Sequence, residues 1–392
     1  MHHTEEEARR TLDLARSRRD EFVEFLAGLA RVESPSDHPE TIRGVHALVG
    51  PALEELGFDV RVVPGRVSGD HLLARPKGRS RGRPTQLLIG HMDTVWPLRT
   101  LERMPVEVVD GRLHGPGTLD MKGGLAMMIF ALRVLRDLGR EPEVTPVIFL
   151  NADEEVGSPD SRRWVRRLAR VANRALVLEP AMGAEGHIKT ARKGVGRFQV
   201  TIRGRAAHSG LEPELGASAI LELSHVIQSL NELNDPEHGT TVNVGLVDGG
   251  VRPNVVAPLA SAVVDARVTT VENGRRLEEA VAALAATVPG VELEWSGGME
   301  VAPLERTPRN RVLWERVRSV GGALGMELQE TTAGGGSDGN TTSRFTATLD
   351  GIGPVGDGAH ADHEHILIDA TVDRCALLAA LLTTPAQPID AS

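Results

Sequence analysis

Cysteine is almost absent from this sequence: its 392 residues include one, Cys375. A single cysteine allows no disulfide within the chain, so nothing in the sequence points to an oxidising compartment. Long apolar runs are also missing, since none approaches the ~18 residues that a membrane-spanning helix needs. The charged N-terminal stretch MHHTEEEARR contains no apolar segment of the kind found in secretory signals. From these absences we expect a cytoplasmic protein that contacts no membrane.

Positive charge is in the minority. The chain has 44 Lys and Arg residues against 54 Asp and Glu residues, which gives a net charge of -10. A nucleic-acid-binding face would need clustered basic residues. The basic run SRRWVRR instead alternates with apolar positions, as the solvated side of a helix does. We therefore expect no nucleic-acid partner. The composition, 41% hydrophobic and 25% charged, is that of a globular protein, and the length suits two domains.

Short apolar runs alternate with helix-like stretches over much of the chain. The runs FDVRVV, QLLIG, VTPVIFLNA and RALVLEP are rich in Val, Leu and Ile, and GGLAMMIFALRVLRDLG and SRRWVRRLARVA lie between them. This order predicts an α/β domain with a mixed sheet flanked by helices, formed by residues 1–191 and 304–392. In such sheets, ligands bind at the carboxyl ends of the strands.

Residues 192–303 have a different pattern. GRFQVTIRGR and PLASAVVDARVT alternate apolar and polar residues, as half-buried strands do, and two helical segments lie among them. The order β-α-β-β-α-β predicts an inserted α+β domain with one sheet and two helices.

Polar side chains follow the apolar runs of the first half of the chain. Four successive segments end in acidic or imidazole groups: His91 with Asp93, Asp120, Glu154 with Glu155, and Glu179. Taken alone, each ending is better explained by a strand that turns into solvent. Carboxylates gathered at one edge of a sheet repel one another and raise each other's pKa, and a bound cation makes such a cluster tolerable. The recurrence therefore favours a metal site.

The residue types in these segments suit particular metals and roles. Imidazole and carboxylate ligands without thiolates fit zinc, and also manganese or cobalt. Asp93 is suited to orient His91, because a ligating histidine usually donates its other N–H to a carboxylate. Glu154 and Glu155 face different ways on an extended strand end, so one can bind metal while the other transfers protons. The segment GHADHEHI supplies further imidazoles, with three histidines competing for one position: His360, His363 and His365.

The ordered set of motifs resembles a known family. GHMDTV, GPGTLDMKGG, NADEEVGS, LEP, GRAAHSG, GGGSDGN and GAHADHE occur in the order found in the M20 metallopeptidases, which include glutamate carboxypeptidases, aminoacylases and succinyl-diaminopimelate desuccinylases. The resemblance covers nearly the whole chain, and the carboxypeptidase G2-like branch looks nearest. Any one motif is weak, but the ordered set is specific.

The resemblance implies a di-zinc centre with a bridging aspartate. It places His91 and Glu179 on one metal, Glu155 and His360 on the other, Asp120 between them, and Glu154 as the general base. His360 is preferred to its two neighbours because it follows the GDGA turn, as the family's ligand does. The resemblance also implies a cis peptide bond between Asp120 and Met121.

Further implications concern the substrate and the inserted domain. In the family, the counterpart of His208 reaches the active site of the partner subunit, and those of Asn254 and Arg267 contact the substrate carboxylate. A guanidinium suits that contact because it binds carboxylates through two hydrogen bonds. The loop GGGSDGN, with Gly335, borders the substrate pocket. The resemblance thus implies a homodimer in which residues 192–303 form a dimerisation and lid domain.

The sequence therefore predicts a di-zinc hydrolase that cleaves an amide bond next to a free carboxylate, in a small peptide or an N-acyl amino acid. An aminoacylase, a dipeptidase or a desuccinylase of the same family is the main alternative. GGSDG also matches the nucleophile elbow of serine hydrolases, but that motif needs a preceding strand and a following helix, and its flanks here are polar and Gly-rich. A non-catalytic binding protein would lack a ligand or the base, and none is missing.

Overall fold

The computed structural model describes residues 5–78 and 82–386, and the chain divides into two compact units. The first unit comprises residues 1–190, 306–332 and 337–392, and the second comprises residues 191–305 and 333–336. The second unit thus starts and ends within two residues of the range 192–303 predicted for the inserted domain. It also takes in part of the Gly-rich loop, which the sequence analysis assigned to the first domain.

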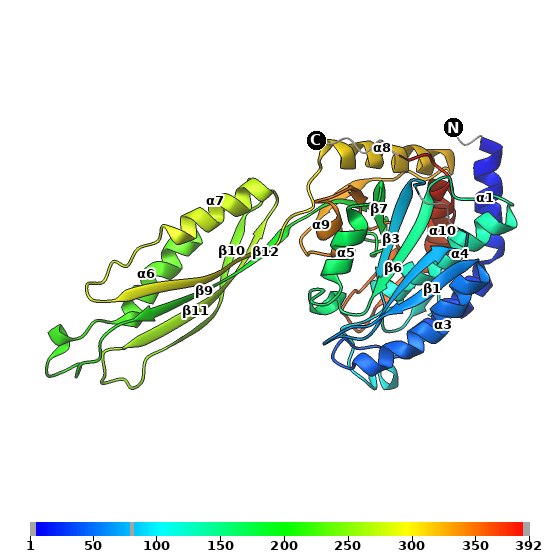
Figure 1. The fold of residues 1–392 in the computed structure, drawn as a ribbon. Coiled ribbons are helices and arrows are strands. Elements are labelled where there is room, and N and C mark those ends of the chain that lie inside the picture. The colour runs from blue at the N-terminus through cyan, green and yellow to red at the C-terminus, as the bar shows by residue number, and fades with distance from the viewer. Residues whose placement is uncertain (1–4, 79–81, 387–392) are drawn as a thin grey trace. The chain divides into compact units, whose positions relative to one another are not determined.

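A six-stranded mixed sheet forms the centre of the first unit (Figure 1). Its strands, in spatial order, are β1 (Phe58–Val63), β2 (His71–Pro76), β6 (Thr145–Asn151), β3 (Thr85–His91), β7 (Arg174–Val177) and β14 (Ala347–Leu349). Strand β3 runs parallel to β6 and β7, and β14 runs parallel to β7, whereas β2 is antiparallel to both of its neighbours. The predicted α/β class with a mixed sheet is confirmed.

Helices cover both faces of this sheet, which explains its apolar strands. Leu87 and Ile89 pack with α5 (Arg162–Ala169), whereas Leu88 belongs to the larger core on the other face. The helices of that larger core are α1 (Glu5–Ser17), α2 (Arg19–Ala30), α3 (Ile42–Glu55), α4 (Gly123–Asp137), α8 (Pro308–Ala323) and α10 (Ile368–Leu382). All seven residues of β3 are buried. The strand is packed on both faces, so its carboxyl end, where His91 lies, is held in place.

Smaller elements complete the first unit. A four-stranded sheet contains β15 (Gly356–Asp357), β16 (His365–Leu367), β5 (Arg112–His114) and β4 (Glu107–Val109), and β8 (Ile188–Arg192) pairs with β13 (Glu330–Ala333). Helix α9 (Asp338–Thr342) is short, and further helical turns lie at Pro39–Thr41, Thr100–Glu102, Thr118–Lys122 and Glu154–Val156. Within the described residues, no helix combines the length and apolar character needed to cross a membrane.

The second unit has the predicted order β-α-β-β-α-β. Its elements are β9 (Gly194–Arg203), α6 (Ala219–Glu232), β10 (Thr241–Gly249), β11 (Leu259–Val268), α7 (Val271–Ala282) and β12 (Glu292–Val301), with a helical turn at Pro213–Leu215. The spatial order of the strands is β10-β11-β9-β12. Both helices pack on one face of this sheet (Figure 1). Alternate residues of β9 are buried, so the apolar face of each strand meets the helices.

Candidate metal centre

Three segments of the first unit bring three of the five predicted ligands together. Strand β3 ends at His91, β7 leads into Glu179, and Asp120 lies in the helical turn Thr118–Lys122 that leads into α4. The start of α4 lies against the end of β7, where a Cβ added at Gly124 would stand only 2.2 Å from the backbone oxygen of Leu178. Glycine at this position therefore allows the close approach that brings Asp120 and Glu179 to the same place.

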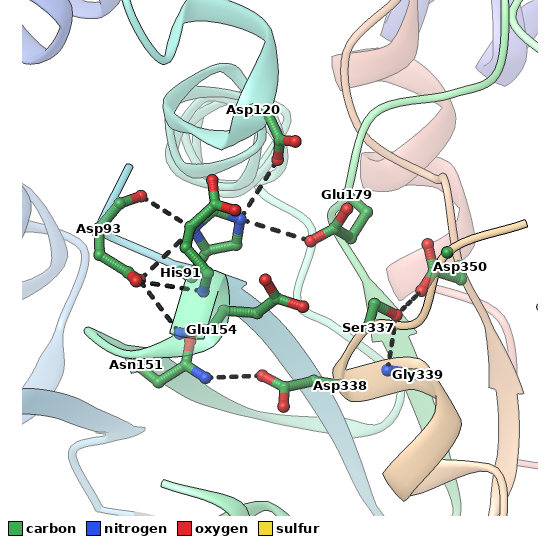
Figure 2. A network of polar contacts seen from close by, with 12 residues as sticks. His91, Asp93, Asp120, Asn151, Glu154, Glu179, Ser337, Asp338, Gly339 and Asp350 are labelled. Atoms are coloured by element: carbon green, nitrogen blue, oxygen red, sulfur yellow. Dashed lines mark hydrogen bonds and ion pairs between the residues drawn. The ribbon is translucent and has the colours of Figure 1, made fainter. Parts of the chain in front are cut away.

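The first group of candidate ligands is His91, Asp120 and Glu179. Nε2 of His91 lies 3.2 Å from Oδ1 of Asp120 and 3.4 Å from Oε1 of Glu179. Figure 2 shows the His91 ring between Asp93 on one side and these two carboxylates on the other. His91 is buried, with 1% of its surface exposed, so its orientation is set by these neighbours.

The second group is Asp120, Glu155 and His360. Nε2 of His360 lies 3.4 Å from Oδ2 of Asp120 and 3.3 Å from Oε2 of Glu155. Asp120 thus directs one carboxylate oxygen toward each histidine, which is the arrangement a bridging ligand needs. The Asp120–Met121 peptide bond is cis, as the resemblance implied. The His360 side chain is 51% exposed, so this side of the site is open in the first unit.

The other two histidines of the GHADHEHI segment lie elsewhere. Among the described residues, neither belongs to a candidate metal group. The ring of His365 packs against the ring of His114 at a centroid distance of 5.0 Å, and its Nδ1 lies 2.9 Å from the backbone oxygen of His363. Nε2 of His363 lies 3.9 Å from Oδ2 of Asp357. Of the three competing imidazoles, the structure brings only His360 to Asp120.

The geometry and charge of the two groups fit a pair of divalent cations. Two ligands of a tetrahedral zinc ion with bonds of about 2.05 Å lie about 3.3 Å apart. The four nitrogen–oxygen distances above fall between 3.2 and 3.4 Å. Oε1 of Glu155 is also buried with no hydrogen-bond partner among the described residues. A cation between these atoms would satisfy it.

The surroundings of His91 favour positive charge. Burial disfavours a charged ring, but contacts with Asp120, Asp93 and Glu179 outweigh burial and raise the pKa of His91 well above its ordinary value. Its Nδ1 lies 2.9 Å from the backbone oxygen of Asp93, which can only accept, so Nδ1 carries a proton. In the neutral ring, Nε2 is then the free nitrogen, and it points at the other two ligands.

Asp93 joins His91 to the turn that follows β6. Its Oδ1 lies 3.5 Å from Nδ1 of His91 and 3.3 Å from the backbone nitrogen of Glu154, which donates to it. Its Oδ2 accepts from the backbone nitrogen of Glu155 at 3.2 Å and from Oγ of Ser36 at 2.7 Å. Asp93 is fully buried. It therefore orients both the histidine and the two adjacent glutamates.

Glu154 belongs to neither group of candidate ligands. Desolvation, and then the negative charge of Glu179, raise the pKa of the Glu154 carboxyl well above its ordinary value. A carboxylate with a raised pKa is a better proton acceptor than one in water. Figure 2 shows its carboxylate beside His91 and Glu179. The position and the pKa direction both suit a general base.

The Gly-rich loop contributes a structural network rather than a nucleophile. A strand, β13, does precede Ser337 and a short helix, α9, follows it, contrary to the sequence expectation. Oγ of Ser337 accepts from the backbone nitrogen of Gly339 at 2.9 Å and donates to Asp350, so this serine caps α9. No histidine hydrogen-bonds to Ser337 in the part of the chain that the structure describes. Asp338, next to it, accepts from Nδ2 of Asn151 at 2.7 Å (Figure 2).

His208, predicted to be catalytic, lies in the second unit together with the predicted substrate-binding residues Asn254, Arg267 and Gly335. The four residues lie in two pairs. Ser209, next to His208, donates its backbone N–H to the oxygen of Asn254 at 3.1 Å, so His208 and Asn254 are neighbours, and both are exposed. Arg267 lies on β11, where its guanidinium donates to both oxygens of Asp265 at 2.8 and 2.9 Å. The backbone oxygen of Gly335 accepts from Arg192, just before β9.

The two pairs lie at opposite ends of one sheet. In the register of β11 and β9, Leu259 is opposite Arg203 and Arg267 is opposite Val195. His208 and Asn254 lie beyond the Leu259 end, whereas Arg267 and Gly335 lie at the other. At about 3.4 Å per residue, the eight steps between Leu259 and Arg267 span about 27 Å. One small substrate cannot contact both ends.

One residue with extensive contacts to this site carried no role in the sequence analysis. The fully buried carboxylate of Glu364 accepts four hydrogen bonds, three of them from the backbone of Gly117–Asp120. The single available signal was an acidic residue between two histidines, directly before the apolar run HILI. That signal did not show what the carboxylate contacts, because the partners lie about 245 positions away in the sequence.

Comparisons with known proteins show what this chain is similar to. The family model described as Peptidase family M20/M25/M40 matches residues 87–384. Carboxypeptidase G2 of Pseudomonas sp. (strain RS-16) is 27% identical over 372 residues, 92% of this chain and 88% of that protein. Aminopeptidase PepT from Bacillus cereus ATCC 10987 superimposes with a TM-score of 0.75 at 22% identity, over 93% of this chain and 98% of its own.

A further solved structure shares the fold. The Bacillus subtilis YXEP protein, a dinuclear metal binding peptidase from the M20 family, superimposes with a TM-score of 0.68. It is 16% identical, and the match covers 94% of this chain and 98% of that one. At these identities, the two structural matches show a common fold and do not by themselves transfer a substrate.

Proposed function

Because the chain belongs to peptidase family M20/M25/M40, we propose that it is a di-zinc hydrolase that cleaves an amide bond next to a free carboxylate. The observation that carries the proposal is the pair of ligand groups that share Asp120. His91 and Glu179 would hold one ion, and Glu155 and His360 the other. The ligand types also accept manganese or cobalt, and zinc is proposed because the donor spacing matches its tetrahedral geometry.

The residues of the chain have separable roles in the proposed reaction. Two bound divalent ions would supply Lewis acidity, which lowers the pKa of water and stabilises negative charge on the amide oxygen. Glu154 accepts the proton of the attacking water and returns it to the leaving amine. Asp93 holds the backbone of Glu154 and Glu155, so the base and its neighbouring ligand keep their relative positions.

The substrate is proposed to be a small peptide or an N-acyl amino acid. Arg267 supplies a guanidinium suited to a carboxylate, and Asp265 holds that guanidinium by two hydrogen bonds. Carboxypeptidase G2, a relative that matches 92% of this chain, supports a carboxypeptidase activity. Glutamate is proposed as one candidate for the released amino acid. An aminoacylase, a dipeptidase or a desuccinylase of the same family is the alternative.

A homodimer is part of the proposal. His208 and Asn254 are separated from Arg267 by about the length of a ten-residue strand, so a single copy of the second unit cannot present all three to one small substrate. Two copies remove this difficulty if each site takes His208 and Asn254 from one chain and Arg267 from the other. The second unit would then serve as the dimerisation and lid domain.

An apolar edge of the second unit supports the same assembly. Strand β10 is the edge strand of its sheet, and it exposes Leu246 and Val247. Ile220 and Leu221 at the start of α6 are exposed as well. An open strand edge with apolar side chains is a ready surface for pairing with a second copy. We define this surface, Leu246, Val247, Ile220 and Leu221, as the β10 edge.

Substitution of the proposed base tests the reaction. Glu154→Ala should keep both ions, because Glu154 is no ligand, and should lose about 10²–10⁴-fold in turnover. Bound metal is measured by elemental analysis and turnover by release of the amine. Glu141→Ala, at an exposed glutamate of the same unit, serves as the control. Full activity in Glu154→Ala would contradict the mechanism. An enzyme that stays active after metal chelation and reacts with a fluorophosphonate would instead be a serine hydrolase.

A substrate screen separates the alternatives. The purified enzyme, loaded with zinc and then with manganese or cobalt, is assayed against N-acyl amino acids that vary on both sides of the amide bond. Preferred release of glutamate or aspartate supports the carboxypeptidase proposal. Preferred release of apolar residues from N-acetyl substrates supports an aminoacylase instead.

A further inference from the structure

Glu364 lies next to the candidate metal centre, where its carboxylate contacts the backbone of the segment that carries Asp120. Its Oε1 accepts from the backbone nitrogens of Leu119 and Asp120, both at 2.9 Å. Its Oε2 accepts from the backbone nitrogen of Gly117 at 2.9 Å and from Nε1 of Trp96 at 2.7 Å. Two hydrogen bonds to each oxygen use the full acceptor capacity of a carboxylate.

The ionised form of Glu364 matches these partners. A protonated carboxyl would need an acceptor for its own hydrogen. Within the described residues, all four partners of the side chain are N–H donors. A neutral Glu364 would therefore lose at least one of these contacts.

The segment Gly117–Asp120 depends on this carboxylate for its backbone partners. The segment precedes α4, and the backbone at Asp120 has non-helical dihedral angles. Helical hydrogen bonds therefore do not satisfy all of its N–H groups. The N–H of Asp120 belongs to the residue whose two oxygens face His91 and His360. A shift of this backbone would move both oxygens at once.

Glu364 also follows His360 by four positions, so one short segment carries a candidate ligand and the acceptor for the bridging residue's backbone. The segment is closed by hydrogen bonds from the nitrogen of Ala361 to the oxygen of Gly358 and from the nitrogen of Glu364 to the oxygen of Ala361. Glu364 therefore links the segment that carries Asp120 to the segment that carries His360, in addition to any ion that the two ligands would share.

We propose that Glu364 is a positioning residue of the dinuclear centre, whose carboxylate fixes the Gly117–Asp120 backbone so that Asp120 can bridge two ions. The inference rests on the proposed function, since it presupposes that Asp120 is a bridging ligand. It assigns Glu364 no contact with substrate. The expected consequence of its loss is a centre that fills its first site and binds the second ion poorly.

Zinc titration of Glu364→Gln tests this role. Glutamine keeps the shape, but its NH₂ group faces two N–H donors in place of an acceptor oxygen. We expect the second zinc ion to bind about 10–100-fold more weakly than in the wild type, as measured by competition with a chromophoric chelator. Trp96→Phe, which removes one donor of four, should give a smaller loss and serves as a second variant if Glu364→Gln does not fold.

Glu222→Gln is the matched control. Glu222 is 1% exposed, and its Oε2 accepts from the nitrogen and Oγ1 of Thr287 and from the nitrogen of Val288, far along the chain from every candidate ligand. It should bind two zinc ions as the wild type does, even if its metal-free unfolding temperature falls as far as that of Glu364→Gln. Wild-type zinc affinities in a folded Glu364→Gln would overturn the inference. Two tightly bound ions in His91→Ala would instead overturn the proposed function.

Discussion

The backbone oxygen of Asp93 is closer to Nδ1 of His91, at 2.9 Å, than the carboxylate of Asp93, at 3.5 Å. The main chain therefore sets the tautomer of the histidine. The carboxylate adds a negative charge and receives the backbone N–H groups of Glu154 and Glu155. One residue thus acts on a candidate ligand through its backbone and on the candidate base through its side chain.

Substitutions of His91 and Asp93 should have different effects on zinc binding. His91→Ala removes a ligand and should abolish one zinc site. Asp93→Asn leaves the backbone oxygen in place and should weaken zinc binding by about 10–100-fold, the range typical of groups that orient a ligand. Because Asp93 also holds Glu154, turnover of Asp93→Asn should stay low at saturating zinc. Zinc titrations and turnover at saturation check this, and full recovery at high zinc would show that Asp93 acts through His91 alone.

Complementation between two inactive variants tests the dimer proposal. A mixture of His208→Ala and Glu154→Ala should regain activity after subunit exchange, because a mixed dimer has one site with an intact Glu154 and the partner's intact histidine. Random exchange gives about a quarter of wild-type activity, since about half the dimers are mixed and each has one working site of two. Each variant alone stays inactive. If the mixture shows no gain after exchange is verified by mass labelling, His208 serves its own chain.

The β10 edge offers a test of assembly. Leu246→Arg places a charge on an apolar surface that the proposed dimer would bury, so the mass in solution should fall from a dimer to a monomer in light scattering. Val171→Arg is the control, because Val171 is also 68% exposed and lies in the first unit. Turnover of Leu246→Arg should fall with the dimer. A dimeric Leu246→Arg would move the interface elsewhere.

Asp160 predicts an acid-dependent loss of stability. Burial disfavours its charge, but hydrogen bonds from the backbone of Val67, Arg66 and Ser68 outweigh burial and lower its pKa from 3.8 to about 2. Since the folded-state pKa lies below the unfolded one, the carboxylate stabilises the fold above about pH 4, and this contribution disappears as the pH falls toward 2. The contribution is about 2 kcal/mol.

The comparison of Asp160→Asn with the wild type isolates this effect. The free energy of unfolding in urea should be about 2 kcal/mol lower for the variant at pH 7, and the two proteins should converge near pH 2. Asp20→Asn, at a side chain that is 97% exposed, should follow the wild type throughout. A difference that does not change with pH would mean that the hydrogen bonds of Asp160 stabilise the fold equally in both charge states.

The family, the mixed α/β class and the β-α-β-β-α-β order of the second unit were all predictable from sequence, and all are confirmed. They follow from ordered motifs and from the period of apolar residues, which are local. Strand pairing is not local. Nothing in HLLARP shows that β2 lies between β1 and β6 and runs antiparallel to both.

The candidate metal centre was also predictable only in part. Histidines and carboxylates at strand ends could be recognised from sequence, because the topology of an α/β sheet gathers such ends at one edge. The direction of the Asp120 oxygens, the role of Asp93 toward two glutamates and the contacts of Glu364 could not. Each of these depends on the path of an irregular loop, for which a sequence pattern carries no period.

The hydrogen bond between Arg306 and Thr190 has a further consequence. The chain leaves the first unit at Thr190 and re-enters it at Arg306, and these two side chains are 2.9 Å apart. Because these two residues are in contact, the first unit can keep the same chain path whether a long segment or a tight turn joins them. The candidate ligands, which all lie in the first unit, would then keep their positions if the segment between Thr190 and Arg306 were exchanged for another.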